Sequence, residues 1–232
     1  MCGRYIIRQT AKAVKEWEKY GPPPFLDSYN VAPTQPVLVL RARGGNPEYA
    51  DVRWGLVPFF SRGEPPKFST INARIETFET AASYRGPWRR GQRCLQLASG
   101  FYEWHLDSYG RKAPYLITIA DQELFGFAAL WDRSVREDGA AVESCVHLTM
   151  PANALMADIH NTGNNPHRMP AIIRAEDRDA WLSGTVQEAR AVLNPYPADL
   201  MSAYEVSTRV NSVKINDPGL IEPVQRAARL FA

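Results

Sequence analysis

The chain has 232 residues, of which 45% are hydrophobic and 22% are charged, a composition that excludes a disordered or fibrous protein. A formal net charge of only +2 argues against a protein that wraps duplex DNA by bulk charge, although the arginines within 89–93 could supply a local basic groove. The three scattered cysteines, Cys2, Cys94 and Cys145, form no CxxC pair, so neither a disulfide framework nor a zinc site is expected.

Membrane insertion and secretion are not expected from the sequence. No stretch approaches the roughly 18 uninterrupted apolar residues that a membrane helix needs. The first residues also lack the charged and then apolar layout of a signal peptide. We therefore expect a cytoplasmic protein.

The first predicted element is a short amphipathic helix over residues 10–20. Thr10 can cap it, Val14 and Trp17 share one face, and Gly21 followed by three prolines ends it. Six segments rich in β-branched or aromatic residues and separated by turn residues then predict strands. They cover residues 37–42, 49–57, 93–104, 114–120, 124–131 and 144–150.

Helical patterns return at residues 76–84, 152–159, 176–193 and 221–230. Strands with short connections and few crossover helices are typical of the α+β class, so we expect mostly antiparallel sheets flanked by helices. No internal repeat and no linker longer than a loop divides the sequence. One domain is therefore expected over residues 1–232, with 217–232 peripheral.

Cys2 carries the most chemical information. Removal of Met1, which is common before a small second residue, would leave Cys2 with a free α-amine beside its thiol. Because an α-amine with a pKa of about 8 is partly neutral at cellular pH, it can attack an aldehyde to form a Schiff base, which the thiol then closes to a thiazolidine. The neighbouring Arg4 suits a phosphate contact or a lowered thiol pKa. The alternative interpretation is an ordinary small residue in a first strand.

Two further segments contain residue types that this chemistry needs. Glu103, in GFYEW, lies among aromatic residues that could take it out of water and raise its pKa, so that it could transfer protons near neutral pH. Asn72 and Arg74, in INARIET, combine an amide that can orient a reacting oxygen with a cation for phosphate. An exposed strand carboxylate and a turn with a helix cap are the alternatives.

Two histidines are candidate acid/base groups. His160 ends the predicted helix at 152–159, and His167 follows seven residues later, before the Arg168-Met-Pro segment. A histidine at a helix end can equally be a surface residue that compensates the helix dipole. His105 and His147 are weaker candidates.

Aromatic segments provide candidate surfaces for unpaired nucleobases. YNVAPTQ at 29–35 and WGLVPFF at 54–60 combine rings with polar residues, and rings stack on bases without reading their sequence. Trp54 and Trp104 are the stacking or wedge candidates. Most such aromatic residues belong to a hydrophobic core, which is the alternative for both.

Eight blocks taken in order resemble the SRAP family, the SOS-response-associated peptidases or abasic-site-processing proteins. The resemblance runs from the N-terminus to residue 170. The blocks are MCGRY, YNVAPTQ, WGLVP, NARIET, RCLQLASGFYEW, PYLITI, FAALW and the segment from Ile-His to Arg-Met-Pro.

The resemblance implies a single α+β domain with mixed, barrel-like sheets and a basic cleft for single-stranded DNA and DNA junctions. It also implies a thiazolidine crosslink between the N-terminal cysteine, exposed after removal of Met1, and the aldehyde of an abasic site. We hypothesise that the same cleft performs or assists the removal of Met1. No metal or organic cofactor is implied, because the aldehyde supplies the electrophile. We expect a monomer that associates with the nucleoid when it binds DNA.

The resemblance also assigns roles to individual residues. The nucleophile maps onto Cys2, the acid/base carboxylate onto Glu103, the sugar-positioning amide onto Asn72 and the histidine of ring closure or reopening onto His160. The spacer before Arg-Met-Pro is longer than is usual in the family, which leaves His167 as the alternative to His160. Arg4 and Arg74 map onto phosphate-contacting positions, and Asn30 maps onto the polar lining near the nucleophile. Together with Trp54, Trp104 and Arg168, they make up the expected DNA-binding residues.

Two other functions compete with abasic-site capture. An N-terminal-nucleophile peptidase or amidotransferase would also use Cys2, as the nucleophile of acyl transfer. A non-catalytic module that binds single strands would use the cleft and its aromatic residues alone. The later motifs favour the abasic-site family over both.

Overall fold

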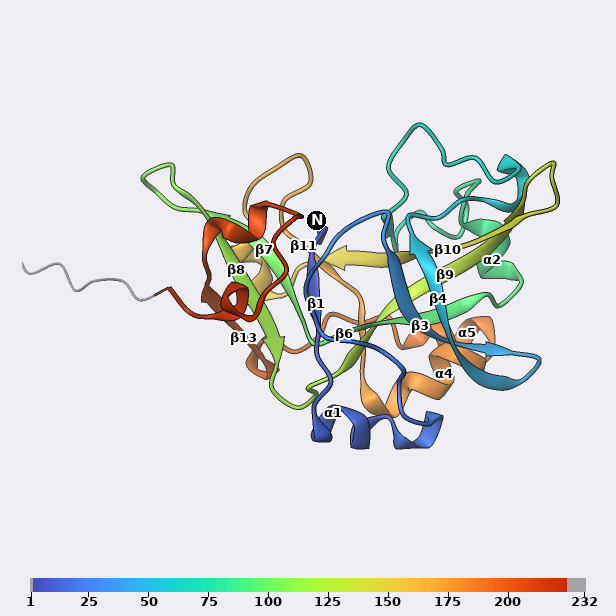
Figure 1. Cartoon of the computed structure of the whole chain (residues 1–232), viewed down its shortest axis with the longest axis horizontal. Helices are drawn as coiled ribbons and strands as arrows, with labels where there is room; N and C mark the ends of the chain where they lie inside the picture. The colour runs from blue at the N-terminus through green and yellow to red at the C-terminus, as the bar shows by residue number, and fades with distance from the viewer. Residues whose placement is uncertain (1, 225–232) are drawn as a thin grey trace, which may run out of the picture.

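The computed structural model describes residues 2–224, which form two β-sheets that meet beside the first strand (Figure 1). The strands are β1 Tyr5–Ile7, β2 Ser28–Val31, β3 Pro36–Arg43, β4 Asn46–Trp54, β5 Asn72–Arg74, β6 Arg93–Ala98, β7 Gly100–Leu106, β8 Lys112–Ile119, β9 Phe125–Val135, β10 Ala141–Pro151, β11 Arg168–Pro170, β12 Ile172–Ile173 and β13 Met201–Glu205. The α-helices are α1 Ala11–Glu16, α2 Arg85–Arg89, α3 Ala154–Ile159, α4 Arg178–Ser183 and α5 Val186–Ala191.

The larger sheet closes into a small barrel. Its order is β11-β10-β4-β3-β6-β9-β12, and an additional pairing of β10 with β9 joins the two ends of the central ring. The pairings of β10 with β4 and β5 are parallel, and the other pairings of this sheet are antiparallel. The predicted α+β fold with mixed, mostly antiparallel, barrel-like sheets is confirmed.

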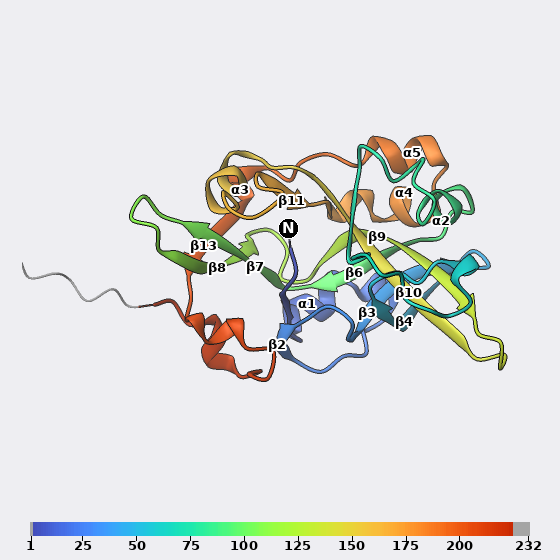
Figure 2. The same cartoon turned by 90° about the horizontal axis from the view of Figure 1, so that it is seen from above.

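The smaller sheet is antiparallel and has the order β13-β8-β7-β1-β2. In Figure 1, β1 runs between this sheet on one side and the barrel strands on the other. Seen from above in Figure 2, helices α2, α4 and α5 lie behind the barrel, and α3 lies beside β11. The start of the chain is therefore held where the two sheets meet.

The segment predicted as one strand over residues 93–104 is strand in the structure but is divided into two, β6 and β7, because the chain changes sheets at Ser99. Residues up to Ala98 pair in the barrel, and residues from Gly100 pair in the smaller sheet. Between them, the Ser99 N–H donates to the Ile6 carbonyl at 2.8 Å. The strand signal is uniform along this segment, so it could not reveal the change of partner.

The first predicted helix is confirmed as α1. The Thr10 hydroxyl accepts a hydrogen bond from the Ala13 N–H at 3.0 Å, as a helix cap does. Trp17 is completely buried, and its indole donates to the Leu124 carbonyl at 2.8 Å. Trp17 and the Glu16 carboxylate, which accepts hydrogen bonds from the Glu123 and Leu124 N–H groups, therefore attach this helix to the residues just before β9.

Two other helix predictions need correction. Residues 76–84 form consecutive turns, in which the Thr80 hydroxyl donates to the Thr77 carbonyl at 3.1 Å, a local bond that competes with helix formation. The helix predicted over 176–193 is broken at Gly184, and Thr185 then caps α5 through a capping box with Glu188. The helix predicted at 152–159 is confirmed as α3, whereas most of the one at 221–230 lies outside the described residues.

The segment after β13 packs against the smaller sheet. Leu220 is completely buried in a second apolar cluster with Ile6, Tyr102, Val206 and Val210. Among the described residues, no helix is both long and apolar enough to cross a bilayer.

We predict that Gly100→Ala destabilises the fold by about 1–3 kcal/mol, a typical cost of overpacking. A Cβ at Gly100 would lie 2.9 Å from the Ile117 carbonyl oxygen, a backbone atom that cannot move without disturbing β8. Urea unfolding would measure the loss. Gly86→Ala is the matched control, because the atom nearest to its new Cβ is the flexible end of the Arg90 side chain. Equal midpoints for the wild type and Gly100→Ala would contradict the prediction.

Candidate functional site

Four elements bring the predicted reacting groups together where the two sheets meet. Cys2 leads into β1, Glu103 lies in β7, which pairs with β1, Asn72 opens β5, and His160 ends α3. These residues are separated by up to 158 positions in the sequence. The pairing of β1 with β7 and the packing of α3 on β7 bring Cys2, Glu103 and His160 together. The pairing of β5 with β10 adds Asn72 to the same site.

Cys2 is buried and held through its backbone. Its side chain and backbone together are 1% exposed, and the Asn72 side-chain amide donates to the Cys2 carbonyl at 3.1 Å. Burial, with a smaller contribution from the charge of Glu103, raises the pKa of the Cys2 thiol well above its ordinary value. A hydrogen bond from the thiol to the Arg4 carbonyl acts in the opposite direction but is a smaller effect than burial. The sulfur is therefore a neutral thiol at physiological pH, and the expected lowering of its pKa is not found.

Glu103 is a carboxyl group poised to transfer protons. It is 2% exposed, and burial raises its pKa to about 7. A carboxyl group with this pKa is present in both protonation states near neutral pH, as a general acid and base requires. The prediction that removal from water raises the pKa of Glu103 therefore agrees with the structure.

His160 lies directly beside this carboxyl group. Its Nε2 is 3.8 Å from Glu103 Oε2, and its Nδ1 is 2.9 Å from the Arg168 carbonyl oxygen. Burial lowers the pKa of His160 to about 4, so the ring is neutral at physiological pH. When Nδ1–H donates to the Arg168 carbonyl, Nε2 keeps its lone pair toward Glu103.

His167, the alternative histidine, has different surroundings. It is exposed, has a positive φ of 56°, and its Nδ1 lies 2.9 Å from the Ala157 carbonyl oxygen. The ring therefore contacts the backbone of α3. The geometry brings His160 and not His167 next to Glu103.

Asn72 is oriented by a parallel pairing. It lies opposite His147 where the short strand β5 pairs with β10. Its Nδ2 is used in the bond to Cys2, whereas its buried Oδ1 has no hydrogen-bond partner among the described residues. A buried acceptor of this kind is suited to a hydroxyl group of a bound molecule.

Three predicted DNA contacts converge on one segment, residues 207–215. The Arg4 guanidinium donates to the Val210 carbonyl at 2.6 Å and to Asn30 Oδ1 at 2.8 Å. The buried Asn30 amide donates to the carbonyls of Ser212 and Ile215 at 2.9 and 2.7 Å. The Trp104 indole donates to Asn211 Oδ1 at 3.0 Å. These side chains position the segment beside β1 and β7.

The sequence interpretation did not include residues 207–215. The segment forms a short 3-10 helix, Thr208–Asn211, with exposed residues after it. Its polar composition gave no periodic signal, and it follows the last of the recognised blocks. The side chains that donate hydrogen bonds to its carbonyls, those of Arg4 and Asn30, lie almost 200 positions earlier in the chain.

The remaining two arginines lie near β5 and β11. Arg74 is exposed and donates to Asn165. Arg168 makes two bonds to the Glu76 carboxylate, at 2.8 and 2.9 Å, and one to the Thr149 carbonyl at 2.8 Å. Arg74 is therefore open to solvent, whereas Arg168 is held in an ion pair.

Trp54 is a core residue. It is completely buried, its indole donates to the Ile71 carbonyl at 2.9 Å, and its ring lies 5.2 Å from the His147 ring and 5.5 Å from the Tyr5 ring. A nucleobase cannot stack on a ring enclosed in this way. The expectation of a wedge at Trp54 is therefore corrected to a packing role behind the site.

His147 belongs to the same buried layer. Burial lowers its pKa to about 3, and its Nδ1 lies 3.3 Å from Gln96 Oε1.

Within residues 2–224, no group of three or more His, Cys, Asp or Glu side chains is arranged to hold a metal ion.

Known proteins resemble the chain over most of its length. The family model of SOS response associated peptidase (SRAP) matches residues 1–213. The abasic site processing protein YoqW of Bacillus subtilis (strain 168) is 36% identical over 231 residues, which are 96% of this chain and 99% of that protein. The abasic site processing protein YedK of Escherichia coli (strain K12) is 31% identical over 236 residues, 97% of this chain and 100% of that protein.

A solved structure agrees with the fold. The crystal structure of a protein from Bacteroides thetaiotaomicron matches with a TM-score of 0.79 and 27% identity, covering 95% of this chain and 100% of that one.

We predict that Glu103→Gln makes the protein more stable relative to the wild type as the pH rises. The folded-state pKa of Glu103, about 7, exceeds the unfolded value of 4.5, so its contribution to stability is complete below pH 4.5 and is lost as the pH rises through 7. The loss is about 3 kcal/mol for a shift of this size, and a glutamine does not undergo it.

Urea unfolding of both proteins between pH 4.5 and 8 measures this difference. Glu137→Gln, on an exposed turn, is the control and should follow the wild type. A difference between Glu103→Gln and wild type that does not change with pH would show that Glu103 titrates normally.

Proposed function

The chain belongs to the SRAP family, and on that premise we propose that it captures abasic sites in single-stranded DNA as a covalent thiazolidine at Cys2. The observation that carries the proposal is the buried Glu103–His160 pair beside Cys2, with the pKa of Glu103 raised to about 7. The relatives named abasic site processing proteins support the same DNA lesion as substrate.

Capture joins one aldehyde to the two nucleophilic groups of Cys2. Once Met1 is removed, the α-amine attacks the aldehyde carbon C1′ of the ring-opened sugar and gives a carbinolamine. Loss of water forms the Schiff base, and the sulfur then attacks the same carbon and closes the five-membered ring. One water leaves in total, and no oxidant or reductant is needed.

Glu103 supplies the proton transfers of this sequence. In its protonated form it gives a proton to the departing hydroxyl group, and as a carboxylate it accepts the thiol proton during ring closure. Because burial keeps the Cys2 sulfur protonated, a base is needed at that step. Neutral His160 presents its Nε2 toward the Glu103 carboxyl group at 3.8 Å, and the Asn72 amide oxygen accepts a hydrogen bond from a sugar hydroxyl.

DNA binding is assigned to the residues around this opening. Arg74 is the exposed cation next to Asn72 and contacts a phosphate. Arg4 and Arg168 contribute positive charge beside the site while they hold residues 207–215 and Glu76. The partly exposed Trp104 lies against Asn211 and, with Asn30 behind it, forms one wall for a single strand or a junction. DNA bound in this way would place the protein at the nucleoid.

The acyl-transfer alternative is less well supported. A cysteine peptidase or amidotransferase uses a thiolate, and such thiols have lowered pKa values in electropositive surroundings. Burial and the charge of Glu103 act in the opposite direction on Cys2. The buried neutral thiol fits a reaction in which the amine attacks first and the sulfur follows within the same molecule.

Cys2→Ala is expected to abolish the covalent complex while leaving reversible DNA binding. The substrate is a single-stranded oligonucleotide with one abasic site, mixed with protein that lacks Met1. A denaturing gel and intact mass should show a wild-type adduct equal to protein plus oligonucleotide less one water. Alanine keeps the α-amine but cannot close the ring, so its Schiff base should be trapped only after reduction with borohydride.

A denaturant-resistant complex of equal yield from Cys2→Ala without reduction would rule out Cys2 sulfur as the closing nucleophile. No adduct from the wild type, together with glutamine hydrolysis that depends on Cys2, would favour the amidotransferase alternative.

We also expect Glu103 to take part in removing Met1. Hydrolysis of the peptide bond before Cys2 needs a base that activates water. Glu103 suits this role because it is a buried carboxyl group whose pKa is raised to about 7. Intact mass of Glu103→Gln, made in cells without methionine aminopeptidase activity, should show Met1 retained, whereas Glu137→Gln should lose it. Efficient loss of Met1 from Glu103→Gln would assign the step to another group.

A further inference from the structure

A large exposed apolar side chain stands on the loop that leads into the site. Phe68 is 63% exposed and belongs to neither apolar cluster of the fold. Three residues separate it from Asn72, so its Cα lies within about 14 Å of the Asn72 Cα even in a fully extended chain. An aromatic ring that remains in water at this distance from the reacting groups is available to a bound substrate.

The two ends of this loop are fastened to the barrel. The Gly63 N–H donates to the Ser134 hydroxyl at 2.8 Å, and the Leu56 N–H donates to the Thr70 carbonyl at 3.2 Å. The buried Trp54 indole bonds the next carbonyl, that of Ile71. Trp54 therefore fixes the base of the loop, although its own ring is enclosed.

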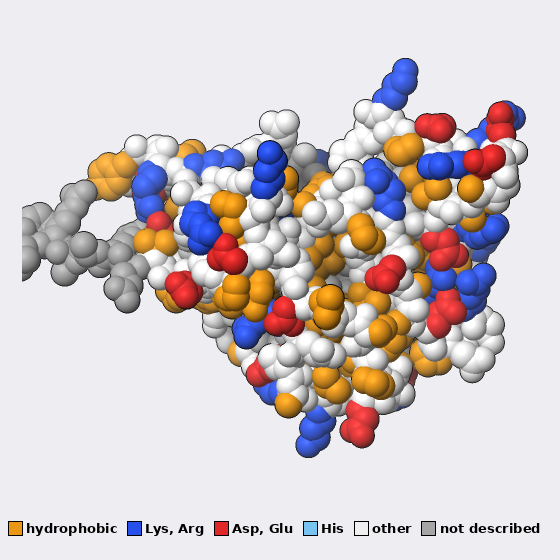
Figure 3. Space-filling view, in the orientation of Figure 1, with side chains coloured by type: hydrophobic (Ala, Val, Ile, Leu, Met, Phe, Trp, Pro, Cys, Tyr) orange, Lys and Arg blue, Asp and Glu red, His pale blue; other side chains and the backbone are white. Residues whose placement is uncertain are grey.

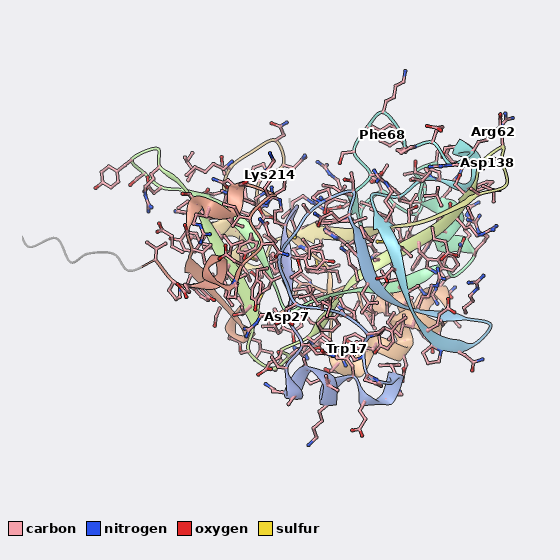
Figure 4. The ribbon with its side chains drawn as sticks, in the orientation of Figure 1. Trp17, Asp27, Arg62, Phe68, Asp138 and Lys214 are labelled. Carbon is pink, nitrogen blue, oxygen red and sulfur yellow. The ribbon has the colours of Figure 1, made fainter. Side chains whose placement is uncertain are left out.

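Phe68 lies on the same edge of the molecule as the start of β1. Figure 4 shows it on the upper edge, with Lys214 on the segment 207–217 toward the other side of β1. From above, the loop that contains Phe68 and the segment that contains Lys214 flank the first strand (Figure 2). Lys and Arg side chains are distributed along this upper edge in Figure 3. Both Lys67 and Lys214 are exposed, which suits a polyanionic strand.

We propose that the ring of Phe68 stacks on the nucleobase that adjoins the abasic site, in the gap left by the missing base. This inference rests on the proposed function. An abasic nucleotide leaves its neighbouring base without a stacking partner on one side, and an aromatic ring on a fixed loop can replace that partner. Stacking of this kind contributes about 1–3 kcal/mol per base and accepts any base, so it fits a protein that recognises the absence of a base and not a sequence.

The test uses reversible binding, so that it does not depend on crosslinking. The probe is a short fluorescent single strand with one central tetrahydrofuran, an abasic analogue without an aldehyde. A second strand carries tetrahydrofuran also at both neighbouring positions, which removes the bases that Phe68 would contact. Fluorescence anisotropy gives the Kd of each strand for wild type, Phe68→Ala and Phe68→Trp.

Phe68→Ala should raise the Kd of the first strand about fivefold or more and leave that of the second unchanged, while Phe68→Trp restores tight binding. Leu26→Ala removes another exposed apolar side chain, 89% exposed and next to Asp27 on the lower part of the molecule in Figure 4, and should change neither Kd. Equal Kd values for wild type and Phe68→Ala, or an equal loss on both strands, would overturn the proposal.

The same measurements separate this proposal from the capture reaction. A Phe68 effect on the tetrahydrofuran strand without any wild-type adduct on a true abasic site would support the stacking and defeat the covalent chemistry. An adduct from the wild type with no effect of Phe68→Ala on either Kd would support the covalent chemistry and defeat the stacking.

Discussion

The burial of Glu103 where the two sheets meet is the constraint on which the site depends. A carboxyl group that is 2% exposed resists ionisation, and its pKa of about 7 follows from that desolvation. The same burial keeps His160 neutral and the Cys2 sulfur protonated. Three groups with different ordinary pKa values are thus adjusted by one physical cause. At neutral pH the site therefore holds a neutral imidazole, a neutral thiol and a carboxyl group that is present in both protonation states.

The site is buried because it lies at the seam, the line along which the two sheets meet. β1 belongs to the smaller sheet, and the barrel contributes Asn72 through a strand of only three residues. The four candidate groups come from different elements, and two of them are oriented by backbone carbonyls: Asn72 by that of Cys2, and His160 by that of Arg168. A seam of this kind encloses the reacting atoms and leaves the surrounding loops open to a polymer.

The residues expected to contact DNA divide into two groups in the structure. Arg74 and Trp104 remain at least partly open to solvent, whereas Asn30 and Trp54 are buried and Arg168 is held by Glu76. The buried members act on the shape of the opening: Asn30 holds residues 207–215, and Trp54 holds the base of the loop that carries Phe68. The motifs therefore include residues that shape the proposed DNA-binding surface from inside, such as Asn30 and Trp54, as well as residues exposed on it, such as Arg74.

The sequence by itself determined the α+β class, most barrel strands, the capped first helix, and the identities of Cys2, Asn72, Glu103 and His160 as candidates. Local patterns suffice for the class, the strands and the helix, because alternation, capping and turn residues act between near neighbours. The candidate residues came from their chemistry and from the resemblance of their motifs to the family. Local patterns could not show that the segment 93–104 changes sheets at Ser99, that residues 76–84 form turns instead of a helix, or that Trp54 is enclosed. Only the tertiary structure decided these points and the choice of His160 beside Glu103, because burial and pairing depend on residues far apart in the chain.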